Sequence, residues 1–399
     1  MSSVTQSNKS SAVVSALVKH ADKQAFVYGM ENGLPNHSHE IVYSTKAMSS
    51  DNAATYSFDV VKAGILSKCW LKVEVQYATS ITKYATDGFL NMLNSVTLSN
   101  NNRTLEVLHP QDIRAYINSL PERERQAWDM AVMRDADAAV ANAAPLVAYL
   151  PLPFSFADSA EKYLDTNYLD NLRVSVQINA LSTVMTGAGA FSTSASKFHL
   201  YGDYIVMEES AYATYRDNQF KGKPLEYLWK SSFQEGDVNC TATTSFTVNL
   251  ACDNVVTKTR VRVLNKAAAD DSFFVRPVSR AHGAGEIKSL QLKGNGKVLW
   301  EGDALAICAF NGIRLSQDDA TSHDAEYFGD LELDWRTLVP SSADMFKGGL
   351  SLKNIAGPQL VITMGTAATA DDDIQINHEV MQFISVDNKS GRMDVASSL

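Results

Sequence analysis

The chain has 399 residues, of which 45% are hydrophobic and 20% are charged, so it can bury sizeable cores and form more than one domain. Its net charge of −10 excludes a protein whose main surface grips nucleic acid, because neutralising phosphates requires a basic face.

Targeting signals and cysteine usage predict a soluble protein that folds in a reducing compartment. No apolar run approaches the roughly 18–20 residues of a membrane span, and the N-terminal sequence lacks the layout of a signal peptide. The four cysteines have no C-x-x-C spacing, so we expect reduced core residues typical of the cytoplasm. They are Cys69, Cys240, Cys252 and Cys308.

Residues 1–48 differ from the rest of the chain and predict an N-terminal arm. A Ser-rich start leads to apolar residues 13, 14, 17 and 18, which share one face of a short helix. The segment also carries three cations, Lys9, Lys19 and Lys23. Two interpretations stay open: a disordered or packed leader, and an arm that orders on a neighbouring subunit or on an anionic surface such as a membrane. These lysines are therefore the candidate assembly or membrane contacts.

Residues 49–207 read as a β-domain with a helical insertion. Strands are expected over 53–79 and 89–108, and helical composition follows over about 110–142, with an acidic first turn after Pro121. Residues 145–156 return to an extended conformation, and strands follow at 171–179 and 198–207. A polar, helical linker is expected at 208–232, before a second β-domain at 233–399.

The second β-domain repeats the first. The hairpin pattern of residues 95–106 recurs at 289–300 with an offset of 194, and each copy has an Asn/Gly turn between alternating strands. Three further pairs of segments recur in the same order: Tyr56–Val60 with Ser245–Val248, Trp70–Val75 with Arg260–Leu264, and Arg173–Ile178 with Gln359–Met364. We therefore expect two tandem all-β sandwiches, each of roughly 170–190 residues. The helical insertion of the second is reduced to Asp303–Phe310.

Four segments, in this order, resemble one known family. They are Asn94–Leu105, the Pro-Leu-Pro-Phe stretch within Tyr149–Phe156, the strand and acidic linker Leu200–Glu209, and Ser342–Leu352. Together with the duplication, they are similar to the double jelly-roll major capsid proteins of tailless icosahedral viruses, and we expect a bacteriophage. The resemblance covers about residues 50–390.

The resemblance implies a fold and a set of partners. Three chains, each with two jelly rolls, would form a pseudo-hexagonal homotrimeric capsomer that tiles a shell around an internal membrane. Minor capsid or vertex proteins would be further partners. We expect a virion protein that is made in the host cytoplasm and has neither sequence-specific nucleic-acid binding nor a cofactor.

Motifs for catalysis or metal binding are weak in this sequence. Gly294–Lys297 lacks the spacing of a phosphate-binding loop, and Gly-x-Ser-x-Gly is absent. His37 with His39 could supply two metal ligands, and acidic loops at 317–319 and 371–373 could hold calcium. The interpretation we favour is a solvated loop in each case, so neither a metal site nor an enzyme is expected.

The alternative function is a receptor- or carbohydrate-binding protein built from two sandwiches. A clustered aromatic face with polar neighbours would favour it. We instead expect the five tryptophans to be packing anchors: Trp70, Trp128, Trp229, Trp300 and Trp335.

Overall fold

In a computed structural model of the chain, the described residues are 37–49, 53–76, 83–84, 87–133, 146–158, 162–180, 185–186, 195–219, 225–240, 243–265, 274–275, 285–310, 330–335, 349–370, 372–387 and 391–396. The arm up to residue 36, with Lys9, Lys19 and Lys23, lies outside them. Among the described residues, no helix has both the length and the hydropathy for a membrane crossing.

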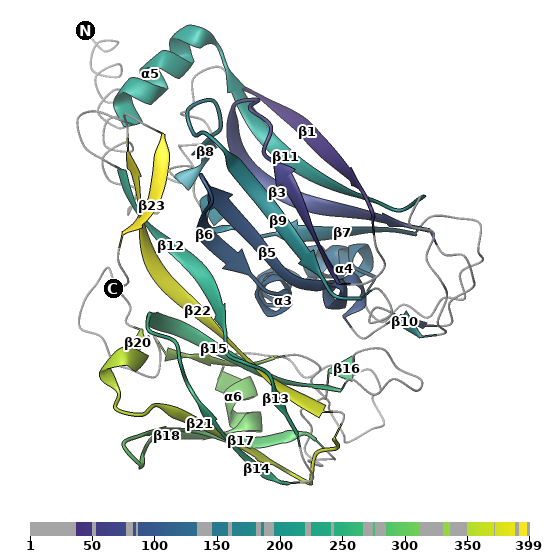
Figure 1. The fold of residues 1–399 in the computed structure, drawn as a ribbon, viewed down its shortest axis with the longest axis vertical. Coiled ribbons are helices and arrows are strands. Elements are labelled where there is room, and N and C mark those ends of the chain that lie inside the picture. The colour runs from purple at the N-terminus through teal and green to yellow at the C-terminus, as the bar shows by residue number, and fades with distance from the viewer. Residues whose placement is uncertain are drawn as a thin grey trace, which may run out of the picture.

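The first jelly roll is a sandwich of two antiparallel sheets (Figure 1). One sheet has the order β1-β11-β3-β7, with β8 also paired to β3, and the other has the order β2-β9-β5-β6. A small sheet pairs β10 with β4. The bounds are β1 His37–Ala47, β2 Ala54–Asp59, β3 Ile65–Val75, β4 Lys83–Tyr84, β5 Leu93–Asn100, β6 Arg103–Leu108, β7 Leu146–Leu152, β8 Leu164–Asp165, β9 Leu172–Ile178, β10 Met185–Thr186 and β11 Lys197–Met207.

The second jelly roll repeats this plan (Figure 1). Its larger sheet has the order β12-β22-β15-β16, with β13 and β23 paired to β22 and with β19 and β20 paired to β15. The other sheet has the order β14-β21-β17-β18. The bounds are β12 Leu225–Gln234, β13 Val238–Asn239, β14 Ser245–Asn249, β15 Val255–Asn265, β16 Phe274–Val275, β17 Ile287–Gly294, β18 Lys297–Asp303, β19 Leu331–Asp334, β20 Leu350–Ser351, β21 Gln359–Met364, β22 Asp372–Asp387 and β23 Arg392–Ala396.

The duplication extends to the strand registers. The β5–β6 ladder shifts register between Leu98 and Ser99, and the β17–β18 ladder shifts between Leu292 and Lys293, at the same offset of 194. Both hairpin turns have two residues at positive φ, namely Asn101 and Asn102 in one and Asn295 and Gly296 in the other. This is the turn that matches the twist of paired strands. The expectation of two tandem all-β sandwiches is confirmed.

Helices occupy the connections between strands. In the expected insertion, α3 spans Pro110–Ser119 and α4 spans Glu122–Ala131, whereas 134–142 lie outside the described residues. The counterpart of α3 is α6, Ala304–Phe310, which follows β18 as α3 follows β6. The linker range 208–232 holds α5, Glu209–Gln219, and the first part of β12. Short 3-10 helices occur at η2 Gly88–Met92, η3 Ser155–Asp158 and η7 Leu352–Asn354.

Two apolar cores lie between the paired sheets, and they do not divide at the linker. The first core includes Trp229, Ile384, Val386 and Met393, which come from β12, β22 and β23 of the second half. All four cysteines are buried and none forms a disulfide. Burial raises the pKa of Cys240, Cys252 and Cys308 to about 11, so these thiols are protonated at neutral pH.

Candidate assembly surfaces

The two jelly rolls meet where β12 and β22 of the second lie against β6 and α3 of the first (Figure 1). The Val107 amide donates to Ser231 Oγ at 3.1 Å. His109 Nδ1 lies 2.7 Å from Ser232 Oγ, which accepts a further bond of 2.6 Å from Asn377 Nδ2. These bonds involve β-strand backbone and buried side chains, so they hold one jelly roll against the other in a defined register.

A buried arginine is central to this junction. Arg260 of β15 is 4% exposed and contacts carboxylates from both jelly rolls: Asp112 of α3 at 2.5 Å, Glu332 at 2.9 Å and Glu379 at 3.1 Å. Burial alone would raise the pKa of Glu379, but Arg260 and nearby lysines outweigh it and lower the pKa to about 2. Glu379 is therefore ionised at neutral pH, and the contacts of Arg260 join α3 to the second jelly roll.

Two more arginines extend the charged layer. Arg114 of α3 lies 3.0 Å from Asp87 and 2.6 Å from Asp129, and Arg262 of β15 lies 4.0 Å from Asp87. Arg262 Nε also donates to Gln375 Oε1 at 2.9 Å. Asp330, 4.0 Å from Arg262, has its pKa raised to about 6 because burial outweighs the arginines.

A polar cavity of about 110 Å³ remains beside these residues, lined by Gln111, Gln234, Asp237, Arg262 and Gln375 among others. A polar cavity of this volume has room for a few water molecules.

Glu106 of β6 fastens a loop of the first jelly roll to β12. Its buried carboxylate accepts from the Ser155 amide at 3.0 and 2.9 Å. Ser155 Oγ in turn accepts from the Lys230 amide at 2.9 Å. Burial raises the pKa of Glu106 well above its usual value, and the hydrogen bonds from Ser155 oppose this rise without cancelling it.

An aromatic row, exposed at Tyr43 and half-buried at Tyr201 and Trp70, lies on the outer face of the sheet β1-β11-β3-β7. Tyr43 stacks on Tyr201 with a centroid distance of 5.0 Å, and Tyr201 stacks on Trp70 at 5.6 Å with the planes 7° apart. Ile41 and Tyr43 of β1 are among the exposed large apolar residues. Trp70 packs against Tyr201 on this outer face, because β3 alternates and turns Leu71 and Val73 inward. Trp229 and Trp335 are buried as expected.

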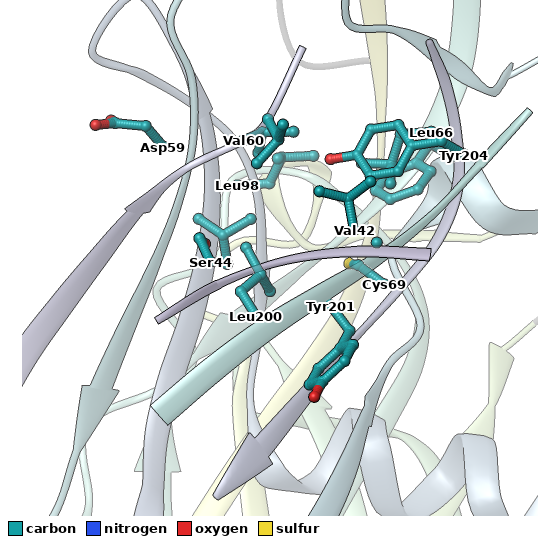
Figure 2. Close-up of a pocket in the computed structure, with 14 residues that line it drawn as sticks. Val42, Ser44, Asp59, Val60, Leu66, Cys69, Leu98, Leu200, Tyr201 and Tyr204 are labelled. Carbon is teal, nitrogen blue, oxygen red and sulfur yellow. The ribbon is translucent and has the colours of Figure 1, made fainter. Parts of the chain in front are cut away.

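One pocket between the sheets of the first sandwich is too small for a cofactor. Between its sheets lies a space of about 10 Å³, close to the volume of one water probe. Figure 2 shows Val42, Leu98 and Leu200 lining this space, whereas the Tyr201 ring points to the other side of its strand.

The other sequence-predicted sites have protein partners or lie outside the described residues. His39 Nδ1 lies 3.1 Å from Asp203 Oδ1. Asp372 Oδ2 accepts from the Thr369 amide, and Asp373 Oδ1 accepts from Asn239 Nδ2. Residues 317–319 and 371 lie outside the described ranges, as do Lys9, Lys19 and Lys23. The sequence analysis did not identify the junction arginines as functional residues. The signal that could have found them is a pair of cations, Arg260 and Arg262, at alternate positions of one strand.

No protein-family model matches the sequence, and no curated protein sequence matches it. Solved structures of other proteins do match the fold of this chain. A quasi-atomic model of the PBCV-1 virus capsid matches with TM-score 0.67 and 14% identity, over 91% of this chain and 97% of that one. The Faustovirus major capsid protein matches with TM-score 0.60 and 11% identity, over 88% and 91%. The mavirus major capsid protein matches with TM-score 0.51 and 10% identity, over 90% of each chain.

The chain has the double jelly-roll fold. The matches cover both jelly rolls and the junction between them, so the similarity is to the complete architecture and not to one β-sandwich.

Proposed function

We propose that this protein is the major capsid protein of an icosahedral virus and works by self-association. The observation that carries the proposal is the agreement of nearly the whole chain, over both jelly rolls, with capsid proteins of several viruses. Because one fold can serve many functions, the proposal also rests on the rest of the molecule. Its described surface carries exposed apolar residues on strands, while its two jelly rolls are held together by buried ion pairs.

The proposed unit is a homotrimer with a pseudo-hexagonal outline. Two jelly rolls of the same plan in each chain would give six similar blocks around a three-fold axis. The division we propose is an arm at 1–48, jelly rolls at 49–207 and 233–399, and a linker at 208–232. β1 lies in the arm range but belongs to the first jelly roll, because it pairs with β11. β12 begins in the linker range but belongs to the second jelly roll, because it pairs with β22.

In this role the protein would be a component of the virion capsid and would catalyse nothing. Its partners would be copies of itself, and then minor or vertex proteins. A bacterial host, synthesis in the host cytoplasm and an internal membrane remain parts of the proposal.

Native mass tests the proposal directly. Light scattering of the purified protein should give three times the chain mass of 43.6 kDa, stable to dilution, and electron microscopy should show shells under assembly conditions. A protein that stays monomeric and forms no shells at any concentration would contradict it.

The basic arm gives a second test. We propose that Lys9, Lys19 and Lys23 contact an anionic membrane surface, where each cation contributes about 1 kcal/mol. Deleting residues 1–24 should leave the trimer intact and abolish flotation with anionic lipid vesicles. Flotation that survives the deletion would contradict this role, and neutral vesicles are the control.

The alternative, a carbohydrate-binding protein, is favoured by the aromatic row with polar neighbours. However, Tyr201 stacks on Tyr43 and on Trp70, so the faces of its ring are already occupied by protein neighbours. Binding of soluble glycans that is lost in a Tyr43→Ala variant would favour this alternative.

A further inference from the structure

The last described strand, β23, completes the core of the first jelly roll. Met393 of β23 is 0% exposed and belongs to the first core together with Leu98 of β5 and Leu172 of β9. The strand reaches this position as a continuation of β22, with which it pairs antiparallel. The first jelly roll therefore contains an apolar residue that is synthesised after both of its own sheets and after the second jelly roll.

Polar contacts hold β23 against the first jelly roll. The Met393 amide donates at 2.9 Å to Oδ1 of Asn100, a fully buried side chain at the end of β5. Asn100 Nδ2 donates at 2.5 Å to the carbonyl of Asp170, in the connection before β9. Arg103 of β6 forms an ion pair with Asp394 of β23. One buried carboxamide and one ion pair thus join β23 to three segments of the first jelly roll.

The backbone just before β23 is fitted to the same jelly roll. Gly391 has a φ of +64°, and a Cβ atom there would lie 2.4 Å from the Tyr168 carbonyl oxygen. Any other residue would be strained at this φ and would also collide, so the position requires glycine. The Tyr168 hydroxyl donates to the Asp387 carbonyl at the end of β22, at 3.2 Å. The connection before β9 therefore contacts the chain on both sides of the turn from β22 to β23.

Both sides of this contact depart from the internal repeat. β22 corresponds to β11, because β22 lies between β12 and β15 as β11 lies between β1 and β3. However, β11 is followed by the helix α5, whereas β22 is followed by β23. At the hairpin offset of 194, Asn100 corresponds to Gly294, so the second hairpin lacks the carboxamide that accepts from β23. The strand and the side chain that receives it are thus additions to the repeated plan, and they meet each other.

We propose that β23 is a clasp, which makes closure of the first jelly roll wait for synthesis of the second. An N-terminal domain generally folds first, while the rest of the chain is still being made. Here a chain that stops before Met393 has a gap in the first core, and Asn100 lacks its donor from β23. Because such a gap is costly in a packed core, the first jelly roll stays open until β23 arrives. The clasp is independent of the proposed capsid function, because it acts within one chain.

Substitutions in the full chain test the contact of the clasp. In Met393→Ala, we expect amide hydrogen exchange in β5 and β9 to be at least about tenfold faster, because the variant leaves a cavity in the first core. Exchange in β14 and β21 of the second jelly roll should keep its wild-type rates. The matched control is Val395→Ala on the same strand, which is 38% exposed and should change neither jelly roll. Equal effects of the two variants, or faster exchange confined to β22 and β23, would overturn the clasp.

Chain length tests whether closure waits for β23. A chain that ends at Ala396 keeps β23 and should show wild-type exchange, whereas a chain that ends at Asp387 should lose protection in β5 and β9. A synthetic peptide of residues 388–399 should restore this protection when it is added in excess. The same peptide with Met393→Ala should bind at least about tenfold more weakly. Protection that persists without β23, or that the wild-type peptide does not restore, would contradict the proposal.

The clasp and the capsid proposal fail in different ways. Wild-type exchange in the chain that ends at Asp387 overturns the clasp, while trimers and shells of the full chain would still support the capsid. A full chain that shows the expected exchange in Met393→Ala but stays monomeric, without shells, overturns the capsid and leaves the clasp.

Discussion

At the scale of single residues, the junction between the two jelly rolls depends on buried ion pairs. Arg260 has three carboxylate partners, and Asp112 comes from the other jelly roll. A buried ion pair adds little net stability compared with an apolar pair, but breaking one is costly because the remaining charges keep their burial penalty. The cluster favours this orientation of the two jelly rolls, because separating Asp112 from Arg260 would leave a buried charge without this partner.

Removing Arg260 should therefore destabilise the protein strongly. We expect Arg260→Met to lower the free energy of unfolding by about 3–5 kcal/mol, because Asp112, Glu332 and Glu379 lose their shared partner. Urea unfolding at neutral pH measures this. The control is Arg173→Met, which breaks an exposed pair with Asp59 and should cost less than about 1 kcal/mol. Similar losses in the two variants would contradict the argument.

The pH dependence follows from Glu379. Its pKa is about 2 in the folded protein against an ordinary 4.5, so its contribution is complete above pH 4.5 and is lost as pH falls toward 2. The difference in unfolding free energy between wild type and Glu379→Gln should shrink by about 2 kcal/mol between pH 7 and pH 3. Urea titrations at pH 7 and pH 3 measure it, and a constant difference would refute the assignment.

At the scale of elements, hairpins were the most predictable parts. Alternating strands around Asn100–Arg103 and Gly294–Lys297 specify both the strands and the turn, because a two-residue turn with positive φ is matched to strand twist. The alternation of apolar and polar residues did not reveal that β12 begins within the linker range. This strand is defined by its pairing with β22, which is about 150 residues away in the chain.

Gly296 gives a clean test of the turn. Its φ is +73° and a Cβ would meet nothing, so Gly296→Ala should destabilise through backbone conformation alone, by about 1–2 kcal/mol. Gly236 has equally open surroundings without that φ, so Gly236→Ala should leave stability unchanged or slightly raised. Thermal unfolding compares the two. Equal losses would show that the turn conformation is not the cause.

At the scale of the whole molecule, the second half of the chain contributes residues to the core of the first jelly roll. Ile384 lies on β22 of the second half yet packs in the first core. We expect Ile384→Ala to cost about 2–5 kcal/mol and to reduce hydrogen-exchange protection in β5 and β9. Ile362→Ala, equally buried but in the second core, is the matched control and should reduce protection in β17. Loss confined to the second jelly roll in both variants would contradict this contribution.

The sequence by itself determined the duplication, the strands and the turns, because alternation and turn chemistry act between near neighbours in the chain. It also placed α3 and α6 after equivalent strands. Only the tertiary structure decided which faces are covered. Leu105 and Leu299 look alike in sequence, but β22 passes over one and leaves the other exposed. Burial depends on contacts between distant segments, and the long-range pairing of β12, β22 and β15 supplies them here.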